Sequence, residues 1–349
     1  MRRRAARSLD QRRDDARPAR RCSPHRNGTD RPRCGRGAGV GDRSNGLPGR
    51  PVVCGRGRRA PRPFAVGVPA MLPVAVLVAT KRREVLLRER ALLSVASQTI
   101  RPAIVVIVND GPSLGRATKE RARSASAPGT TVVLDNDRMP GAAGAWNAGL
   151  AYLAAHAHPG YVAMLDDDDE WDPDHLEVNA RASLDVDADL SVSGLRIRLD
   201  GVDRPRPLIA ELRATDFLSG NPGWQGSNTF AKLSLLLAVG GFRDGLASLN
   251  DRDLAVRLLR RPGVRTTLVP RWSATWHVGR IGGLSSPGSP AKLDGLAAFW
   301  RVYGRSMTAV EADRFFERAL VLFHFDRRSI VGHNVALASH DEHRGSLHV

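Results

Sequence analysis

Apolar residues occur along the central part of the chain in short runs that are separated by longer stretches of mixed character. A short apolar run bounded by polar or turn-forming residues is typical of a strand buried on both faces of a parallel sheet. Four such runs predict strands at residues 73–79, 103–108, 131–134 and 161–165.

Helical periodicity fills the segments between these runs. It predicts helices at 84–97, at 114–125 and at about 145–156. Because strands and helices alternate, we expect an α/β fold in which a Rossmann-like, mostly parallel sheet is flanked by helices. Helical spacing of apolar residues over 291–325 predicts a C-terminal helical extension, which we place at 289–330.

Acidic residues follow two of the predicted strands. Asp110 comes after the second strand, and the run Asp166 to Asp169 continues the fourth. Alone, each is compatible with an ordinary solvated turn. The carboxyl ends of parallel strands, however, meet at the edge where α/β proteins bind ligands, so together they predict a site. The adjacent carboxylates of this run and Glu170 need a neutralising partner, and a hard divalent cation shared with phosphate is well suited to that role.

The residues after the acidic run predict a tight turn into a helix. Asp172 is expected to cap the helix, Pro173 suits its first turn, and Asp174 and Glu177 complement the helix dipole. A calcium loop is disfavoured, because the run lacks the glycine and the distant glutamate of an EF-hand.

Charge is distributed unevenly. Residues 1–70 contain 19 arginines, no lysine and five aspartates, so they carry +14 of the formal +17 and leave +3 for the rest. This Arg/Gly/Pro-rich segment has no hydrophobic periodicity, and we expect it to be disordered. All three cysteines lie in it, at spacings that match no zinc site. Met71 stands directly before the first strand, which suggests that the preceding segment is not native. The competing interpretation is a basic arm that binds nucleic acid or anionic lipid.

The remaining organisation follows from these patterns. We expect a catalytic domain at 71–288, with a nucleotide-binding half at 71–170 and an acceptor half at 171–288, and a polar tail at 331–349. No apolar run approaches the roughly 20 residues of a membrane span, and the first residues lack the apolar core of a secretory signal. A cytoplasmic enzyme is therefore expected, with peripheral contact at the inner face of the membrane left open.

Several segments occur in the order seen in family-2 glycosyltransferases, which have the GT-A fold. The stretch Tyr161 to Leu176 resembles the D-x-D region of that family. Further resemblances lie at 79–83 (P-T-Y-N-R), 94–102 (S-x-x-x-Q-T-x-x-P), 108–111 (V-D-D-G), 147–149 (R-N-x-G), 240–242 (G-G-F) and 250–254 (E-D-x-D-L). Asn109, Trp146 and Asn250 depart from these motifs, as do three residues of the first segment. The resemblance covers about two thirds of the chain and implies an inverting, metal-dependent transferase that moves a single sugar.

The resemblance also implies roles for residues of the donor site. Asp110 reads the base of a UDP- or dTDP-sugar by accepting its imide N–H, and Thr80 and Arg83 line the same nucleotide pocket. Asp168 is the direct ligand of a Mg²⁺ or Mn²⁺ ion, and Asp166 or Asp167 contacts the ribose.

A second group of roles concerns catalysis and the phosphates. Asp251, near the start of a predicted helix at 251–260, is the general base, although its position also suits an N-cap. His277 completes the metal shell and Arg280 pairs with phosphate, the alternative for the histidine being a structural role. Trp224 either stacks on an acceptor sugar or belongs to the core. The acceptor itself, whether glycan, lipid-linked, protein or small molecule, is not identified by the residues.

Three other functions remain as alternatives. A sugar nucleotidyltransferase requires a glycine-rich phosphate loop after the first strand, where this chain has Ala79 to Arg83 without a glycine. A processive polysaccharide synthase requires membrane helices and a Q-x-x-R-W motif, and Leu268 replaces the glutamine before Arg271 and Trp272. A nucleic-acid-binding protein acting through residues 1–70 leaves the acidic strand ends unexplained.

Overall fold

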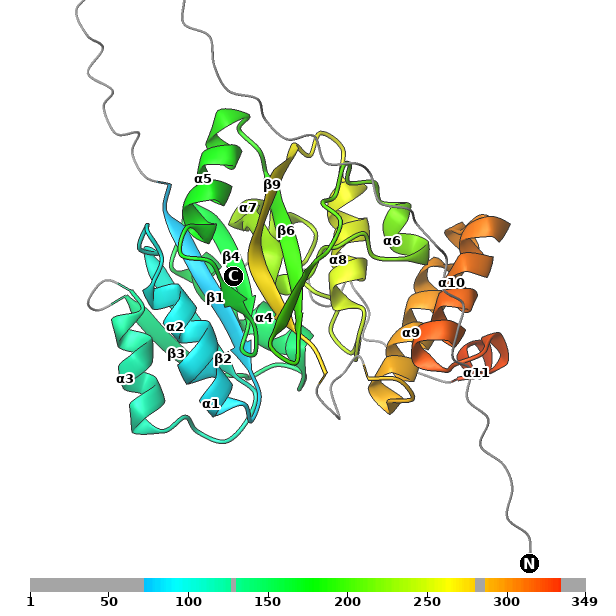
Figure 1. Ribbon diagram of the computed structural model, residues 1–349, viewed down its shortest axis with the longest axis horizontal. Coiled ribbons are helices and arrows are strands. Elements are labelled where there is room, and N and C mark those ends of the chain that lie inside the picture. Colours follow the sequence, from blue (N-terminus) through cyan, green and yellow to red (C-terminus); the bar gives the residue numbers. More distant parts are fainter. Residues whose placement is uncertain (1–71, 127–129, 280–285, 334–349) are drawn as a thin grey trace, which may run out of the picture. The chain divides into compact units, whose positions relative to one another are not determined.

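The computed structural model describes residues 72–126, 130–279 and 286–333 (Figure 1). The predicted disorder of residues 1–70, most of the predicted polar tail and Arg280 lie outside the described residues.

The N-terminal half of the sheet consists of parallel strands. In spatial order they are β3 (Thr131–Asp135), β2 (Ile104–Asn109), β1 (Val74–Thr80) and β4 (Tyr161–Asp166). In β1, residues 74, 76 and 78 point into one apolar cluster and residues 75, 77 and 79 into another. In β1, β2 and β4, burial on both faces is the physical reason for apolar residues without alternation. The four predicted strands are confirmed.

The second half of the sheet is mixed. Beyond β4 the order continues β8 (Thr229–Lys232), β6 (Leu190–Leu199), β9 (Thr266–His277) and β5 (Glu170–Trp171), with β7 (Val202–Pro205) paired to β6. Strand β8 runs antiparallel to both β4 and β6, whereas β9 is parallel to β6. The predicted α/β fold is thus confirmed, with antiparallel strands added to the parallel set.

Helices cover both faces of the sheet (Figure 1). One face carries α1 (Glu84–Leu86), which continues through a π-helical turn (Leu87–Ala91) into α2 (Leu92–Ala96), together with α3 (Arg116–Ser124) and α5 (His175–Asp185). The other carries α4 (Ala142–Ala155), α7 (Leu233–Ala238) and α8 (Asn250–Leu259).

The predicted C-terminal extension is helical. It comprises α9 (Pro290–Tyr303), α10 (Ala309–Phe323) and α11 (Arg327–Gly332), which pack beside α8 and the short helix α6 (Asp216–Ser219). Phe299 and Phe315 stack between α9 and α10 with ring centroids 6.0 Å apart. Within the part of the chain that the structure describes, no helix has both the length and the hydropathy needed to cross a bilayer.

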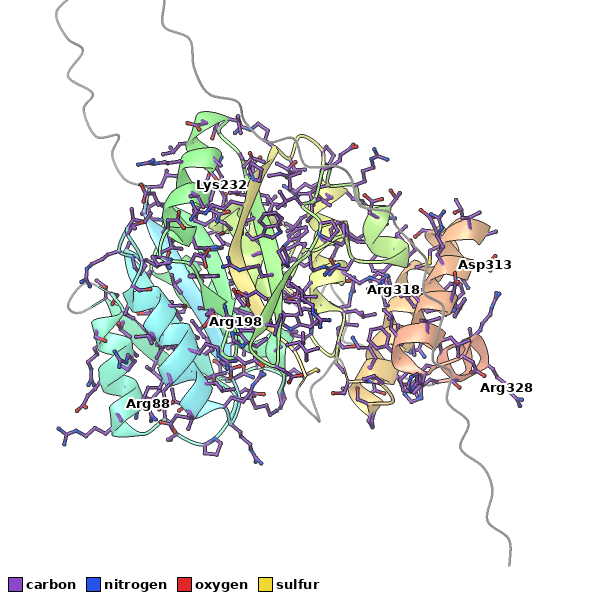
Figure 2. The ribbon with its side chains drawn as sticks, in the orientation of Figure 1. Arg88, Arg198, Lys232, Asp313, Arg318 and Arg328 are labelled. Atoms are coloured by element: carbon purple, nitrogen blue, oxygen red, sulfur yellow. The ribbon has the colours of Figure 1, made fainter. Side chains whose placement is uncertain are left out.

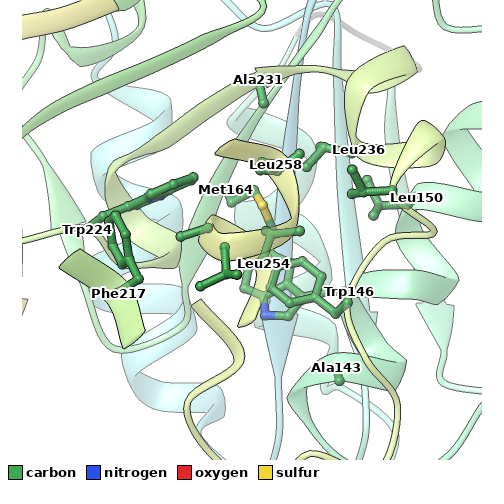
Figure 3. Packing of buried hydrophobic residues seen from close by; sticks show 14 of the residues in the cluster. Ala143, Trp146, Leu150, Met164, Phe217, Trp224, Ala231, Leu236, Leu254 and Leu258 are labelled. Atoms are coloured by element: carbon green, nitrogen blue, oxygen red, sulfur yellow. The ribbon is translucent and has the colours of Figure 1, made fainter. Parts of the chain in front are cut away.

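Two tryptophans that accompany the family motifs belong to the core (Figure 3). Trp146 stacks on Phe242, and Trp224 packs edge-on against Phe217 and donates its indole N–H to Thr229 Oγ1 at 2.5 Å. Trp224 is 1% exposed, so the expectation that it stacks on an acceptor sugar is wrong.

The turn after the acidic run also differs from expectation. Strand β5 intervenes before the helix, and α5 begins at His175 with Asp174 as its N-cap residue. The Asp172 carboxylate instead pairs with Arg196 of β6. The predicted cap at Asp172 is wrong because an ion pair with a strand distant in sequence competes with local capping.

Candidate active site

One cavity of about 1450 Å³ lies at the carboxyl ends of β1, β2 and β4 and extends to α8, α9 and α10. Seven residues singled out in the sequence line it: Thr80, Arg83, Asp110, Asp166, Asp168, Asp251 and His277. Asp167 is not among the lining residues, and Arg280 lies outside the described residues. The fold therefore gathers carboxylates from β2, β4 and α8 around a shared space.

Asp110 lines this cavity directly after β2. One carboxylate oxygen accepts hydrogen bonds from Lys81 Nζ and the Gly141 N–H, both at 2.8 Å, and the other accepts one from Asn136 Nδ2 at 2.9 Å. Burial by itself would raise the pKa of Asp110, but these hydrogen bonds outweigh it and the pKa lies below its ordinary value. Asp110 is thus an ionised acceptor with one oxygen that still has room for a further donor.

Arg83 and Thr80 hold two neighbouring aspartates of the acidic run. The Arg83 guanidinium pairs with Asp167 at 3.0 Å and with Asp168. Thr80 Oγ1 donates to Asp167 Oδ2 at 2.7 Å, and the Lys81 N–H donates to the same oxygen. Asp167 is fully buried in this arrangement. The Asp167 carboxylate therefore orients Arg83 and the end of β1. This role does not match the ribose contact that the sequence suggested for Asp167.

Ser227 organises the other two aspartates of the run. Its hydroxyl donates to Asp169 Oδ2 at 2.6 Å and accepts from the Asp166 N–H at 3.1 Å. Burial, together with the neighbouring carboxylates, raises the pKa of Asp166 well above its ordinary value. Burial chiefly, and the charge of Asp168, raise the pKa of Asp169 to about 8. Asp166 and Asp169 therefore hold their protons more strongly than exposed aspartates do, because several carboxylates crowd this strand end.

Asp251 lies in the first turn of α8 and faces the cavity. The helix begins at Asn250 after Leu249, and no side chain makes a capping hydrogen bond there, so Asp251 has no N-cap role. Burial raises the pKa of Asp251 to about 6, against the opposing influence of the Lys292 charge and of a hydrogen bond from the Gly226 backbone. A carboxylate with such a pKa is ionised near neutral pH and is a stronger base than an exposed aspartate.

Asp253, two residues further along α8, has a different environment. Its carboxylate binds Arg243 at 3.0 Å, Arg257 at 2.7 Å and the Tyr303 hydroxyl at 2.8 Å. It is 1% exposed and does not line the cavity. This network ties α8 to the loop after α7 and to α9, and thereby fixes the direction in which Asp251 points.

His277 closes the cavity from the end of β9. Its backbone N–H donates to Asp169 Oδ1 at 3.1 Å, and its ring Nε2 lies 3.6 Å from Glu170 Oε1 without a hydrogen-bond partner in the described part of the chain. Burial, followed by the charge of Arg90, lowers the pKa of His277 against the opposing charge of Glu170, which favours the neutral imidazole. A neutral nitrogen with no partner is able to act as a ligand or an acceptor.

The donor set bears on the predicted metal. Among the described residues, no three His, Cys, Asp or Glu side chains are grouped closely enough to hold an ion by themselves. Magnesium, however, binds through one or two carboxylates together with substrate phosphate and water. Asp166 and Asp168 therefore fit an ion held jointly with a diphosphate, and do not fit a closed site made of protein groups alone. Asp168 would then share its carboxylate between the ion and Arg83.

Several cavity residues were not predicted. They are Lys81, Arg206, Arg252, Lys292 and Arg318, which come from the end of β1, the loop before α6, and helices α8, α9 and α10. Lys81 and Arg252 lie inside motif-like segments, but Lys81 departs from its motif and Arg252 occupies a position that its motif leaves variable. Arg206, Lys292 and Arg318 belong to no motif. Only the packing of α9 and α10 beside α8 brings Arg252, Lys292 and Arg318 to one end of the cavity.

The chain was compared with known proteins. Residues 75–255, slightly more than half of the sequence, match the model of the family described as Glycosyl transferase family 2. A stretch of 121 residues is 35% identical to the succinoglycan biosynthesis protein ExoW of Rhizobium meliloti (strain 1021). This match covers 33% of the chain and 34% of ExoW, so the chain spans about a third of the length of that relative.

Solved structures of S. aureus TarS have a similar fold. TarS 1-349 in complex with UDP-GlcNAc aligns with a TM-score of 0.52 and 17% identity, over 73% of this chain and 74% of that one. A second TarS structure aligns with a TM-score of 0.50 and 17% identity, over 73% of this chain and 44% of that one. At this level of identity the similarity concerns the fold.

Proposed function

Because the chain belongs to glycosyl transferase family 2 and is a glycosyltransferase, we propose that it transfers a single sugar from a UDP- or dTDP-sugar to an acceptor hydroxyl with inversion. One observation carries the proposal: Asp110, Asp168 and Asp251, which come from three separate elements, line the same cavity. Its volume of about 1450 Å³ exceeds that of an ordinary small-molecule pocket, as a site for two substrates requires.

The donor's base is assigned to the end of β2. Uracil and thymine present an imide N–H, and the ionised Asp110 carboxylate offers an acceptor oxygen for it. Cytosine lacks this proton and is disfavoured. TarS, which shares the fold, was solved with UDP-GlcNAc, which makes that sugar nucleotide the first donor to test.

The diphosphate is assigned to the ends of β1 and β4, beside Arg83, Asp166 and Asp168. Arg83 offers a planar guanidinium that suits phosphate oxygens. A magnesium or manganese ion held between these carboxylates and the diphosphate would supply positive charge that stabilises the leaving nucleotide.

Transfer itself is assigned to Asp251. The acceptor oxygen forms a bond to the anomeric carbon while the bond from that carbon to the diphosphate breaks, and the hydroxyl proton passes to the Asp251 carboxylate. A single attack from the face opposite the leaving group inverts the anomeric configuration. Asp253 holds α8 so that Asp251 faces the cavity.

The proposal is tested with a panel of nucleotides and nucleotide sugars. Calorimetry with UDP, dTDP, GDP and CDP, with MnCl₂ and with EDTA, should show metal-dependent binding of UDP or dTDP and weaker binding of the other two. Asp110→Asn should reduce this preference, because the amide offers one acceptor oxygen in place of two. Equal binding of all four nucleotides would contradict the role of Asp110. If the protein consumes none of the nucleotide sugars, either by hydrolysis or by transfer to an acceptor, the assignment of this cavity as a transferase site is contradicted.

A further inference from the structure

The end of the cavity formed by α8, α9 and α10 is lined by four basic side chains. They are Arg206, Arg252, Lys292 and Arg318, here called the cationic cluster. Two of them are almost completely buried, Lys292 at 3% and Arg252 at 5% exposed. Burial of charge is unfavourable unless a partner compensates it, so such a cluster needs an explanation.

The three arginines of the cluster have no carboxylate partner among the described residues. Arg252 donates to the carbonyl oxygens of Phe217 at 2.8 Å and Leu218 at 2.6 Å, and its guanidinium lies over the Phe299 ring. Arg206 donates to a single carbonyl oxygen, that of Asn221, at 3.1 Å. No hydrogen bond or ion pair of Arg318 occurs within the residues that the structure describes. These contacts orient the guanidinium groups of Arg206 and Arg252 without giving them a negatively charged partner.

The cluster is close enough for its members to repel one another. Burial lowers the pKa of Arg206 and of Arg252, the latter to about 9, and the charge of Arg318 lowers both further. Burial, then the charges of Arg252 and Arg318, lower the pKa of Lys292 to about 8, opposed by Asp251. These directions indicate a local excess of positive charge.

One carboxylate faces the cluster within the cavity. Asp251 interacts electrostatically with Lys292 on one side and with Asp166 on the other. The base therefore lies between the acidic end of β4, where the donor diphosphate is assigned, and the cationic cluster. A ligand that reaches the cluster lies on the acceptor side of Asp251.

We propose that the acceptor carries a phosphate or diphosphate group and that the cationic cluster binds this group while Asp251 receives the proton of the acceptor hydroxyl. The proposal rests on the transferase function proposed above and names its acceptor class. Among the described residues, the three arginines of the cluster have no carboxylate partner and so leave positive charge at this end of the cavity. A phosphate ester neutralises more of that charge than a single carboxylate does, and guanidinium groups bind phosphate with matched geometry.

Two sources of such a phosphate are compatible with the surroundings. Arg318 and Leu322 also line a neighbouring cavity of about 350 Å³, in which Val321 is 67% and Leu322 is 41% exposed. These apolar side chains suit the chain of a lipid-linked phosphate, whereas the cluster alone suits a water-soluble phosphate ester.

The test uses the full chain saturated with UDP and MgCl₂, so that the donor site is filled. Calorimetry then measures binding of glucose 1-phosphate, glucuronic acid and the neutral methyl glucoside. Glucose 1-phosphate should bind at least about tenfold more tightly than the other two, since charge-assisted hydrogen bonds to phosphate are strong. Arg318→Gln should weaken this binding about tenfold.

Arg328→Gln is the matched control. Arg318 lies on the side of α10 that faces the rest of the domain, whereas Arg328 extends outward from α11 and lines neither cavity (Figure 2). Both arginines are exposed, so neither substitution is expected to prevent folding. Arg328→Gln should leave glucose 1-phosphate binding unchanged.

The outcomes separate the proposals. If UDP does not bind, the transferase site itself fails. If UDP binds but glucose 1-phosphate binds no more tightly than methyl glucoside, the phosphate acceptor is refuted. It is also refuted if glucose 1-phosphate binds Arg318→Gln as tightly as it binds the wild type. If glucuronic acid binds as tightly as glucose 1-phosphate, the preference for phosphate over carboxylate is refuted. Binding of farnesyl phosphate assigns the source of the phosphate. If farnesyl phosphate binds more tightly than glucose 1-phosphate, and Val321→Ser removes this difference, the acceptor is lipid-linked. If the two ligands bind equally well, the acceptor is a soluble phosphate ester.

Discussion

Replacing the proposed base should remove catalysis and stabilise the fold at the same time. Burial raises the pKa of Asp251 from 3.8 to about 6, so the folded protein holds this carboxylate ionised at neutral pH against its environment. Each pKa unit corresponds to 1.36 kcal/mol, and the shift therefore amounts to about 3 kcal/mol of destabilisation at neutral pH. Asp251→Asn has the same shape and carries no charge.

The size of the effect depends on pH. Below pH 3.8 the carboxyl is protonated in the folded and the unfolded chain, and it adds no penalty. Between pH 3.8 and about 6 the unfolded chain releases the proton first, so the penalty grows, and above pH 6 it is constant. The free energy of unfolding of Asp251→Asn relative to the wild type should therefore rise by about 2.5 kcal/mol from pH 4 to pH 7.5.

The assay is urea unfolding of both proteins in EDTA across this pH range, with Asp313→Asn as the control. Asp313 is exposed on α10 (Figure 2) and does not line the cavity, so its substitution controls for the loss of an aspartate elsewhere. Donor turnover by Asp251→Asn should fall by about 10² to 10⁴ while UDP binding persists. If the stability difference between Asp251→Asn and the wild type does not change with pH, the uncompensated burial of Asp251 is refuted. If Asp251→Asn retains full turnover, the role of Asp251 as the base is refuted.

Three further predictions concern the surroundings of the base and the donor. Asp253→Asn should lower the free energy of unfolding by about 3 to 5 kcal/mol, because it leaves two largely buried arginines without their carboxylate partner. In urea unfolding, the control Asp313→Asn should change the free energy of unfolding by less than about 0.5 kcal/mol. An equally small loss for Asp253→Asn would contradict the network. Gly295→Ala places a methyl group 2.1 Å from a side-chain oxygen of the loop before α8 and should destabilise α9 by about 1 to 3 kcal/mol in thermal unfolding. Gly332→Ala is the control, because its methyl group meets no atom within 4 Å, and it should leave the melting temperature unchanged. Equal melting temperatures for the two variants would show that the loop before α8 moves away from the added methyl group at Gly295 without cost. Asp168→Ala should abolish the part of UDP binding that depends on Mn²⁺, and calorimetry showing the same metal dependence as the wild type would contradict its role as a ligand.

Most of the parallel half of the sheet was predictable because β1, β2 and β4 are buried on both faces. Such strands must be apolar at successive positions, and β1 is one example, with all of its residues buried. Parallel strands also place their carboxyl ends together, so Asp110 and Asp166 were expected at one edge from their positions alone. The antiparallel strands of the second half have weaker patterns, since β7 is exposed and β5 has only two residues.

Within the acidic run, the sequence did not distinguish the carboxylates. Asp166 and Asp168 line the cavity, whereas Asp167 and Asp169 are buried and bound by Thr80 and Ser227. Consecutive residues at a strand end point in different directions, and their partners come from β1 and from the segment before β8. A local pattern contains no information about such partners.

The amino-acid sequence determined the order of the elements and the strand ends that carry acidic groups, because burial and periodicity are properties of neighbouring residues. Only the tertiary structure decided which charges face one another. Asp251 lies between Asp166 and Lys292, and Arg206, Arg252 and Arg318 meet at one end of the cavity, because α8, α9 and α10 pack side by side. Electrostatic interactions depend on distance in space, and separation along the chain does not encode that distance.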